Sequence, residues 1–242
     1  MNSNGFFRSG DHFAIDLPGA RAVFTTRHGG FSGGPYASLN LGRLTDDDPA
    51  AVQRNRELLQ GRLGVPLAMI RQVHGAEVRR LASPSQPGAA LQEADGQATS
   101  AAGTAPMVLT ADCLPIAVAG DGAAAILHAG WRGLAAGIIE AGVRAVRELG
   151  ASGPLEAVIG PGAGPCCYEV GEEVHARFAS YGPSAKRGRN LDMKSIVRTQ
   201  LERAGVDAVT DLGLCTICSE DFFSHRRDGG VTGRQAGVVW LS

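Results

Sequence analysis

Short runs of apolar residues, bounded by glycine, proline or polar residues, recur along the chain and predict β-strands. Six of these runs lie at residues 22–25, 107–110, 115–119, 124–128, 157–159 and 238–241. The third and fourth flank the Gly-Asp-Gly sequence at 120–122, which is typical of a tight turn. These two strands therefore predict a β-hairpin.

Apolar residues spaced three or four apart predict four helices, at 49–63, 134–149, 171–181 and 191–204. The second has the clearest amphipathic pattern. Its apolar face contains Ile138, Ile139, Ala141, Val143 and Val146, while Arg144, Arg147 and Glu148 can stay solvated. Gly150 then suits a C-terminal cap. Strands and helices intermix without a strict alternation, so we expect one α/β domain with a mixed β-sheet layered with helices.

The length of 242 residues suits a single catalytic domain, which we place at 13–242 after a flexible N-terminal tail at 1–12. The Pro- and Ser-containing segment 83–90 predicts a surface loop. The formal net charge is −1 and no basic stripe occurs, which argues against nucleic acid or a membrane as partner. We expect a small-molecule substrate and a monomer. The sequence shows no signal peptide or membrane span, so we expect a cytoplasmic protein.

Three residues with metal-binding side chains come at the ends of apolar runs. They are His74 in IRQVHG, Cys113 in TADCLP and His128 in AILHAG. Two imidazoles and one thiolate suit Zn²⁺, and catalytic zinc sites commonly keep three protein ligands and one open position. The spacing alone is also compatible with histidines that are merely hydrogen-bonded at strand ends. Five cysteines make a disulfide framework improbable and leave thiols available.

Seven motifs, in order, carry a resemblance to one known family. They are TTRHGGFSGGPYASLNLG, QVHG, ADGQAT, TADCLP, HAGWRG, IGPGAGPCCYEV and the C-terminal segment CT…FFSHRRDGGVTGRQAGVVWL. Together they resemble the laccase-domain or polyphenol-oxidase-like proteins, a family now described as purine nucleoside phosphorylases with adenosine deaminase activity. One bacterial branch is called peptidoglycan editing factor. The resemblance runs from about residue 13 to 241.

The resemblance implies a single α/β domain and places the family's metal ligands on His74, Cys113 and His128, with zinc as the expected ion. It also favours catalytic roles for Asp95 in EADGQAT, as a general acid or base, and for Cys113. Arg132, at a predicted helix start, is a candidate phosphate-binding residue, or a surface ion-pair residue. Asp112 either orients a histidine ligand or satisfies its own loop.

Four further residues are candidates for substrate binding. Arg27 and Asn40 lie in glycine-rich loops, where Asn40 has the hydrogen-bonding groups to contact ribose or base; both could equally order the loop. Tyr168 could stack on a purine, or simply lie at the mouth of the core. Arg234 belongs to an arginine cluster that holds phosphate or is merely solvated. The Cys215–Cys218 CxxC pair is poor evidence for a structural zinc without a second pair, and the adjacent Cys166 and Cys167 do not predict a shared ion.

Three alternative functions remain open. Copper redox chemistry has Met69 and Met107 as nominal axial ligands, but six histidines are too few for a multicopper oxidase. A cysteine hydrolase or amidase acting on cell-wall precursors would use Cys113, His128 and Asp95. A purely structural zinc would need a fourth ligand. We expect a zinc-dependent phosphorylase acting on adenosine, inosine and 5′-methylthioadenosine, which also deaminates adenosine.

Overall fold

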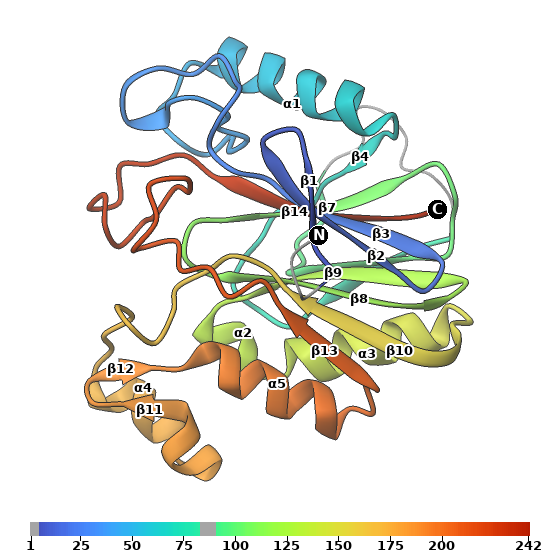
Figure 1. Cartoon of the computed structure of the whole chain (residues 1–242), viewed down its shortest axis with the longest axis vertical. Helices are drawn as coiled ribbons and strands as arrows, with labels where there is room; N and C mark the ends of the chain where they lie inside the picture. Colours follow the sequence, from blue (N-terminus) through green and yellow to red (C-terminus); the bar gives the residue numbers. More distant parts are fainter. Residues whose placement is uncertain (1–4, 83–90) are drawn as a thin grey trace.

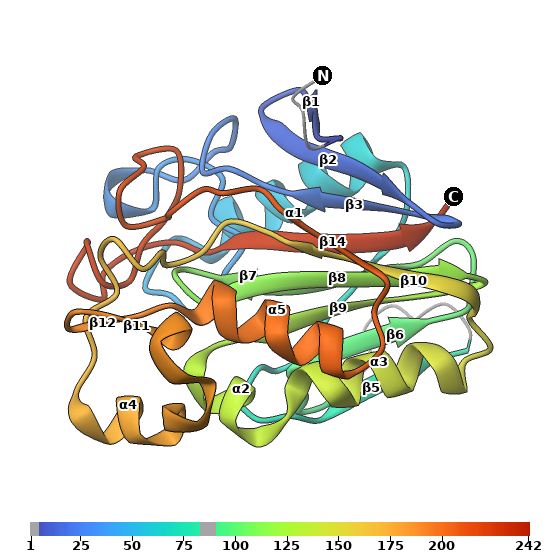
Figure 2. The same cartoon turned by 60° about the horizontal axis from the view of Figure 1, so that its bottom comes forward.

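The computed structural model describes residues 5–82 and 91–242. Two β-sheets lie face to face (Figure 1 and Figure 2). Helix α1 (Pro49–Leu63) packs on the outer face of the first sheet, and α2 (Trp131–Ala136), α3 (Ile138–Glu148) and α5 (Met193–Arg203) cover the outer face of the second, so the molecule has four layers. The single mixed sheet expected from the sequence is therefore two mixed sheets within one α/β domain. Because both faces of each sheet are covered, strands at the centre are apolar at nearly every position.

The first sheet has the strand order β1-β2-β3-β14-β7-β4. It contains both terminal segments of the described chain, since β14 pairs antiparallel with both β3 and β7. Only β4 runs parallel to its neighbour, β7. The bounds are β1 Phe7–Ser9, β2 His12–Leu17, β3 Ala20–Phe24, β4 Leu67–Ala68, β7 Ala105–Thr110 and β14 Gln235–Leu241.

The second sheet has the strand order β13-β10-β8-β9-β6-β5. Its centre is the hairpin predicted around residues 120–122, in which β8 and β9 pair antiparallel. The outer pairs, β10 with β13 and β5 with β6, are parallel. The bounds are β5 Val78–Leu81, β6 Gly96–Thr99, β8 Leu114–Asp121, β9 Ala123–Ala129, β10 Ser152–Ile159 and β13 Ala208–Asp211.

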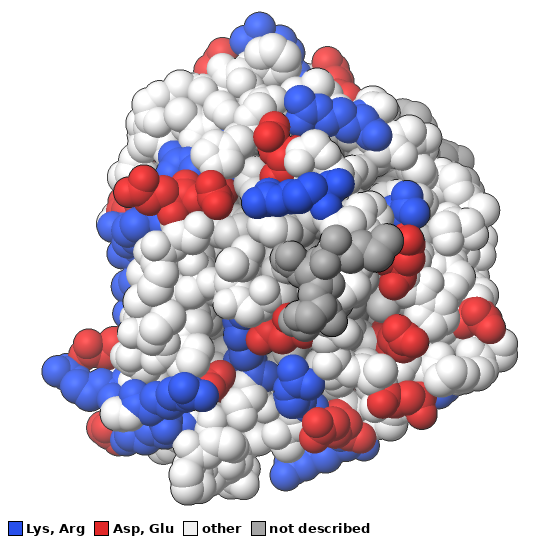
Figure 3. Space-filling view, viewed as in Figure 1, with Lys and Arg blue, Asp and Glu red and all other residues white. Residues whose placement is uncertain are grey.

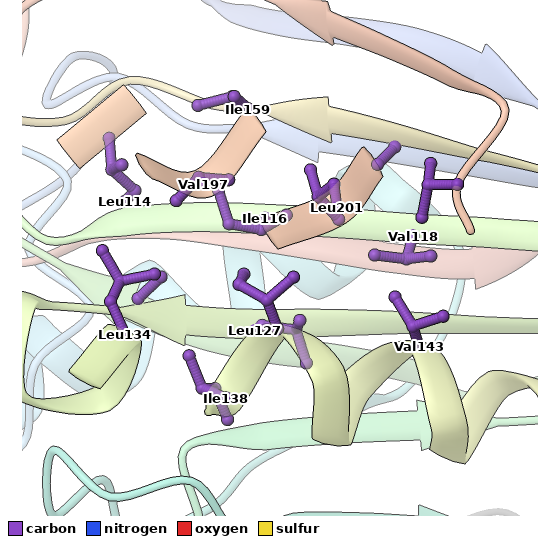
Figure 4. Close-up of a cluster of buried hydrophobic side chains, with 14 of the residues drawn as sticks. Leu114, Ile116, Val118, Leu127, Leu134, Ile138, Val143, Ile159, Val197 and Leu201 are labelled. Carbon is purple, nitrogen blue, oxygen red and sulfur yellow. The ribbon is translucent and has the colours of Figure 1, made fainter. Parts of the chain in front are cut away.

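Alternate side chains of the central hairpin enter two different cores. Leu114, Ile116, Val118 and Leu127 pack against helices α3 and α5, as Figure 4 shows. Between them, Ala117, Ala119, Ala124 and Ile126 face the first sheet and pack with residues such as Phe24 and Val108. This two-residue alternation explains why β8 and β9 read as continuous apolar runs. A third cluster, which includes Leu39, Leu59 and Met107, lies beneath helix α1.

The helices agree with the sequence pattern except where glycine interrupts them. Helix α1 is Pro49–Leu63, with the side chain of Asp48 capping its start and Gly64 in the left-handed conformation at its end. The helix expected at 134–149 is two helices, α2 Trp131–Ala136 and α3 Ile138–Glu148, because Gly137 has a φ of 90° between them. Helix α5 is Met193–Arg203.

The region between β10 and α5 is less regular than expected. The helix predicted at 171–181 ends early: α4 is Glu172–Arg177, and a 3₁₀ segment, η2 Ala179–Ala185, follows it. A small antiparallel pair, β11 Lys186–Arg187 and β12 Asn190–Leu191, leads into α5. A second 3₁₀ segment, η1 Gly34–Tyr36, lies in the glycine-rich loop after β3.

The N-terminal tail is shorter than predicted. Strand β1 pairs with β2, and Phe6 and Phe13 are buried in the core between the sheets, so residues 7–9 and 12 belong to the domain. The aromatic side chains explain the difference, since their burial stabilises an ordered strand. The predicted surface loop at 83–90 lies outside the described residues.

Charged side chains of both signs are interspersed on the face seen in Figure 3. No helix within residues 5–82 and 91–242 is long and apolar enough to cross a membrane.

Candidate metal centre

The structure brings His74, Cys113 and His128 together. His74 lies in the loop between β4 and β5, Cys113 in the turn that joins β7 to β8, and His128 on β9. One donor atom from each side chain lies within 4.8 Å of the donors of the other two. The two imidazole rings meet edge to face, with centroids 4.8 Å apart. The spacing of the three residues in the sequence does not show that they meet, and it is the fold that brings them together.

Strand register places Cys113 beside the end of β9. Pro115 pairs with His128 and Leu114 with Ala129, so the next residue back, Cys113, lies opposite Gly130. The glycine is required at this position because a Cβ on residue 130 would come within 2.8 Å of the Cys113 sulfur. The absence of a side chain at 130 therefore leaves the space that the thiol occupies.

Register also places Asp95 beside His128. Gly96 pairs with Leu127 across β6 and β9, and the backbone N–H of His128 donates to the Asp95 carbonyl at 2.7 Å. The Asp95 side chain is fully buried, and its Oδ1 accepts a hydrogen bond from His128 Nδ1 at 2.8 Å. Holding Nδ1 in this way leaves Nε2 as the ligand atom.

The loop that carries His74 wraps around the same carboxylate. The backbone N–H groups of Val73 (3.1 Å), His74 (2.9 Å) and Gly75 (2.6 Å) all donate to Asp95. His74 itself has a φ of 62°, a region that non-glycine residues rarely adopt. Asp95 therefore positions both histidines, one through its ring and the other through its backbone.

These four contacts bear on the role expected for Asp95. Burial acts to raise the pKa of the Asp95 carboxyl, but hydrogen bonds from His128, Gly75 and Val73 together with the charge of His128 outweigh it and lower the pKa below the usual value. A carboxylate that holds four N–H groups has few free lone pairs for a substrate proton. These contacts give Asp95 a positioning role for both histidines, and its expected role as general acid or base stays a prediction.

The three donors strongly perturb one another. Burial opposes ionisation of the Cys113 thiol, but the His128 and His74 imidazoles outweigh it and lower its pKa to about 6. Burial likewise disfavours a charged His128, yet the Cys113 sulfur and the Asp95 carboxylate raise its pKa to about 9. The centre therefore pairs a thiolate and a buried carboxylate with a positive charge, an environment that favours a cation.

The donor set fits zinc. Two imidazole nitrogens and one thiolate are its preferred ligands, and each is fixed by a neighbour: His128 by Asp95, the His74 backbone by Asp95, and Cys113 by the bare Gly130. His74 is exposed whereas His128 is 4% exposed, so the centre opens on the His74 side. Three protein ligands and one open side are the arrangement that catalytic zinc sites commonly have.

Asp112 does not orient a histidine. Its carboxylate accepts hydrogen bonds from the Thr216 hydroxyl and from the backbone N–H of Arg226, each at 2.7 Å. Its own φ is 89°, so the residue before the thiol ligand turns sharply. Asp112 thereby ties the Cys113 turn to the C-terminal segment, which is the second of the two roles considered for it.

Tyr168 lies beside the centre. Burial raises its pKa to about 12, and the nearby charges of Cys113 and Asp112 add to this shift, while Arg226 and Arg132 oppose it. The Arg226 guanidinium lies over the tyrosine ring, 5.2 Å from its centroid. Tyr168 therefore stays protonated at neutral pH and presents a partly buried aromatic surface near Cys113.

Two of the predicted arginines flank the same space. Arg132 is exposed at the start of α2 and lies 4.4 Å from the Trp131 ring centroid; that helix has only six residues, so its dipole contributes little. Burial lowers the pKa of Arg234, whereas the charges of Cys113 and Asp112 act on it in the opposite direction. Arg234 also donates to the carbonyls of Thr232 and Gly233.

The other two predicted substrate residues are engaged within their own loops. Asn40 is fully buried: its amide NH₂ donates to Thr45 and Asp47, and its oxygen accepts from the backbone N–H groups of Gly42 and Arg234. No group of Asn40 is left for a ribose, so that prediction was wrong and the loop-ordering alternative holds.

Arg27 is similar to Asn40 in this respect. Its Nε donates to the Ala37 carbonyl at 2.6 Å, and its guanidinium lies 4.6 Å from the Phe223 ring centroid. These contacts join the glycine-rich loop to the C-terminal segment, which is the loop-ordering role considered for this residue.

The two nominal axial ligands of a copper site lie elsewhere. The sulfur of Met69 accepts from the Arg56 guanidinium at 2.9 Å, and Met107 is buried in the cluster beneath α1. Neither contact involves the two histidines or Cys113.

Sequence analysis missed one grouping of side chains. The remaining cysteines, Cys166, Cys167, Cys215 and Cys218, have sulfur atoms that all lie within 4.8 Å of one another. Cys166 and Cys167 were not expected to share an ion, yet a tight turn brings both of their sulfurs into contact with that of Cys218. The only sequence signal was the presence of two cysteine pairs, and nothing in it showed that they meet.

Comparisons with known proteins cover nearly the whole chain. A family model described as multi-copper polyphenol oxidoreductase laccase matches residues 21–242. A purine nucleoside phosphorylase of Streptomyces coelicolor is 44% identical over 237 residues, spanning 92% of this chain and 96% of the relative. A purine nucleoside phosphorylase of Pseudomonas aeruginosa is 42% identical over 234 residues, spanning 91% and 93% respectively.

Solved structures share the fold. YlmD from Geobacillus stearothermophilus superposes with a TM-score of 0.88 at 34% identity, covering 98% of this chain and 99% of its own. A Neisseria meningitidis protein gives a TM-score of 0.85 at 34% identity, with coverages of 96% and 100%. With a matching family model, relatives above 40% identity and a shared fold over nearly its full length, the chain belongs to the multi-copper polyphenol oxidoreductase laccase family.

Proposed function

We propose that this protein is a zinc-dependent purine nucleoside phosphorylase. The observation that carries the proposal is the convergence of His74, Cys113 and His128 on one open centre whose geometry is fixed by Asp95. The names of the relatives, purine nucleoside phosphorylases at about 40% identity, supply the reaction class. The reaction would transfer the ribosyl group of a purine nucleoside from the purine to phosphate, which gives the free purine and ribose 1-phosphate.

His74, Cys113 and His128 would hold a zinc ion, which would supply a Lewis acid for an oxygen of a reactant. Asp95 keeps Nδ1 of His128 hydrogen-bonded, so the ring presents Nε2 to the ion. Cys113 contributes a thiolate, and Gly130 leaves the room for it. Each residue thus arrives at the centre already oriented, which lowers the cost of assembling the site.

The groups around the open side match the two substrates. Arg234 and Arg132 are cations near Cys113 and Tyr168, and a guanidinium binds phosphate with two parallel hydrogen bonds. Tyr168 offers a ring for stacking on a purine. Because Asp95 is committed to N–H donors, the proton that the leaving purine requires comes from the phosphate monoanion or from solvent.

We extend the proposal to the substrate range of the family. Adenosine and inosine are the primary nucleosides, and 5′-methylthioadenosine is a third. Deamination of adenosine would be a second activity of the same zinc centre, since zinc deaminases also keep an open metal position. One centre serving both reactions predicts that a ligand substitution removes both together.

The test is a product assay with metal quantification. The wild-type protein is incubated with adenosine or inosine and phosphate, free purine and ribose 1-phosphate are separated by chromatography, and bound zinc is counted. His128→Ala should lose one zinc and both activities. The matched control is His28→Ala, which removes an exposed histidine paired with Asp221 and should retain both. Zinc-loaded wild-type protein that releases no purine would refute the proposal.

A cysteine hydrolase remains the second candidate because Cys113, His128 and Asp95 form a continuous chain of contacts. Its substrate would be an amide, such as one in a cell-wall precursor. His74 argues against it, since a nucleophile–base–acid arrangement has no use for a second imidazole on the thiol. Two results on chelated, metal-free protein would favour the hydrolase: amide hydrolysis is retained, and an alkylating substrate analogue labels Cys113 in a separate sample. Loss of activity on chelation alone favours the zinc enzyme.

A further inference from the structure

The second cysteine cluster is built at one edge of the second sheet. Strands β10 and β13 run parallel, so their C-terminal ends lie side by side. The segment after β10 leads to Cys166 and Cys167, and the segment after β13 leads to Cys215 and Cys218. A bridge between Gly162 and Cys215 continues the parallel pairing beyond the strands and holds the two segments together.

A tight turn makes adjacent cysteines point the same way. The backbone N–H groups of Cys167 and Tyr168 both donate to the Gly164 carbonyl, at 3.2 and 3.1 Å. The Cys218 sulfur lies 3.4 Å from the Cys166 sulfur and 2.8 Å from the Cys167 sulfur. All four sulfurs lie within 4.8 Å of one another. A tetrahedral ZnS₄ centre with Zn–S bonds of about 2.3 Å has sulfurs about 3.8 Å apart, so small side-chain rotations accommodate an ion.

The backbone around the cluster is arranged for a thiolate. The Gly164 N–H donates to the Cys215 sulfur at 3.2 Å. A Cβ on residue 164 would lie 3.1 Å from the Cys166 sulfur and 3.2 Å from the Cys215 Cβ, so this position favours glycine. Thiols are weak hydrogen-bonding groups, and four of them in mutual contact gain little from one another. A cation shared by four thiolates supplies the missing stabilisation.

We propose that Cys166, Cys167, Cys215 and Cys218 bind a second zinc ion, distinct from the three-ligand centre. Four sulfur ligands complete the coordination of zinc and leave no open position, which defines a structural site. The ion fastens the Tyr168 segment to the segment that leads into Arg226, whose backbone holds Asp112. It therefore braces one wall of the catalytic centre without taking part in the reaction.

The zinc content of purified protein and of three variants tests the proposal. Wild-type protein prepared under reducing conditions should hold about two zinc ions per chain, one per tetrahedral site. Cys215→Ser and His74→Ala should each hold about one, and the double variant none. Glu220→Gln, an exposed change in the same segment, is the matched control and should keep both. Because zinc is counted directly, the result does not depend on which substrate the enzyme uses.

If the Cys215→Ser protein does not fold, a second measurement that does not need this variant tests the proposal. Cobalt-loaded wild-type protein should show the intense sulfur-to-cobalt charge-transfer bands of four-thiolate coordination, beyond those of a one-thiolate site, and His74→Ala should retain them. Zinc content of about one per chain in the wild type, unchanged in Cys215→Ser, would overturn the proposal. An intact mass of the wild-type protein that is about two hydrogens lower per disulfide, after preparation under reducing conditions, would also overturn the proposal. It would show that a disulfide and not an ion engages the thiols.

Discussion

Replacing Asp95 with asparagine isolates the part of the metal centre that does not touch the metal. The two side chains have the same shape, but the carboxylate only accepts hydrogen bonds, whereas the amide has one accepting oxygen and one donating NH₂. Asp95 accepts from four N–H groups, two on each oxygen. Either orientation of the amide therefore points an NH₂ at two N–H donors inside a fully buried site.

The magnitude follows from which donors lose their partner. If the NH₂ faces Val73 and Gly75, two partly buried N–H groups lose their acceptor, which costs at most about 1–3 kcal/mol each. If it faces His128, the ring must accept at Nδ1 and carry its proton on Nε2, the atom that binds the metal. Loss of the partner that orients a metal-binding histidine costs about 10–100-fold in metal affinity, or about 1.4–2.7 kcal/mol.

The assay is zinc competition with a chelator of known affinity, alongside denaturant unfolding. Asp95→Asn should bind zinc at the three-ligand centre at least about tenfold more weakly and should unfold at lower denaturant. Asp48→Asn is the control, because Asp48 caps α1 by accepting from Ala50 N–H and asparagine caps equally well. Zinc affinity within twofold of wild type for Asp95→Asn would show that the four hydrogen bonds do not position the ligands.

Three further predictions concern Gly130, the Cys113–His128 pair and the buried His12. Gly130→Ala should lose zinc from the three-ligand centre, because its Cβ would lie 2.8 Å from the Cys113 sulfur, while Gly61→Ala, with nothing within 4 Å, should retain it; equal zinc contents would contradict this. At neutral pH, pKa values near 6 and 9 leave Cys113 ionised and His128 charged, so binding of zinc to the metal-free three-ligand centre should release about one proton, that of His128. Calorimetry in buffers of different ionisation enthalpy measures the number of protons released, and zero release would contradict the prediction. His12 is buried with both ring nitrogens unpaired, and burial together with the charge of Arg62 lowers its pKa to about 4. Between about pH 4 and 6.5 its imidazole is therefore neutral in the folded protein but protonated in the unfolded chain. Stability should therefore fall by on the order of 3 kcal/mol as the pH drops from 6.5 to 4, and His12→Leu should lack that loss; parallel unfolding curves for the two proteins would contradict it.

The sequence pattern located elements whose ends carry local signals. Helix α1 begins and ends where Asp48, Pro49 and Gly64 indicate, because capping and left-handed glycine act within a few residues. The β8–β9 hairpin was equally local. Helix α2 and the break at Gly137 were not separated from α3, since a single glycine is tolerated in a helical pattern and only the packing shows that it adopts a φ of 90°.

The candidate site divides in the same way. His74, Cys113 and His128 were identified from residue type and from the family resemblance, and the structure brings their donor atoms together. The contacts that Asp95 and Asn40 make were not predicted, because each set depends on which backbone N–H groups point at the side chain. For Asp95 these groups belong to residues 73–75, which lie 20 to 22 positions away. For Asn40 one group is local, the N–H of Gly42, and the other belongs to the distant Arg234.

The sequence by itself determined the residue types available for chemistry, the short-range elements and the α/β class, because these depend on side-chain chemistry and on neighbours a few positions away. The tertiary structure alone decided that the strands form two sheets rather than one, and that four cysteines from two separate segments meet. Strand register and parallel pairing are set by packing across the whole domain. A contact between segments fifty residues apart is a property of that packing, and no local pattern encodes it.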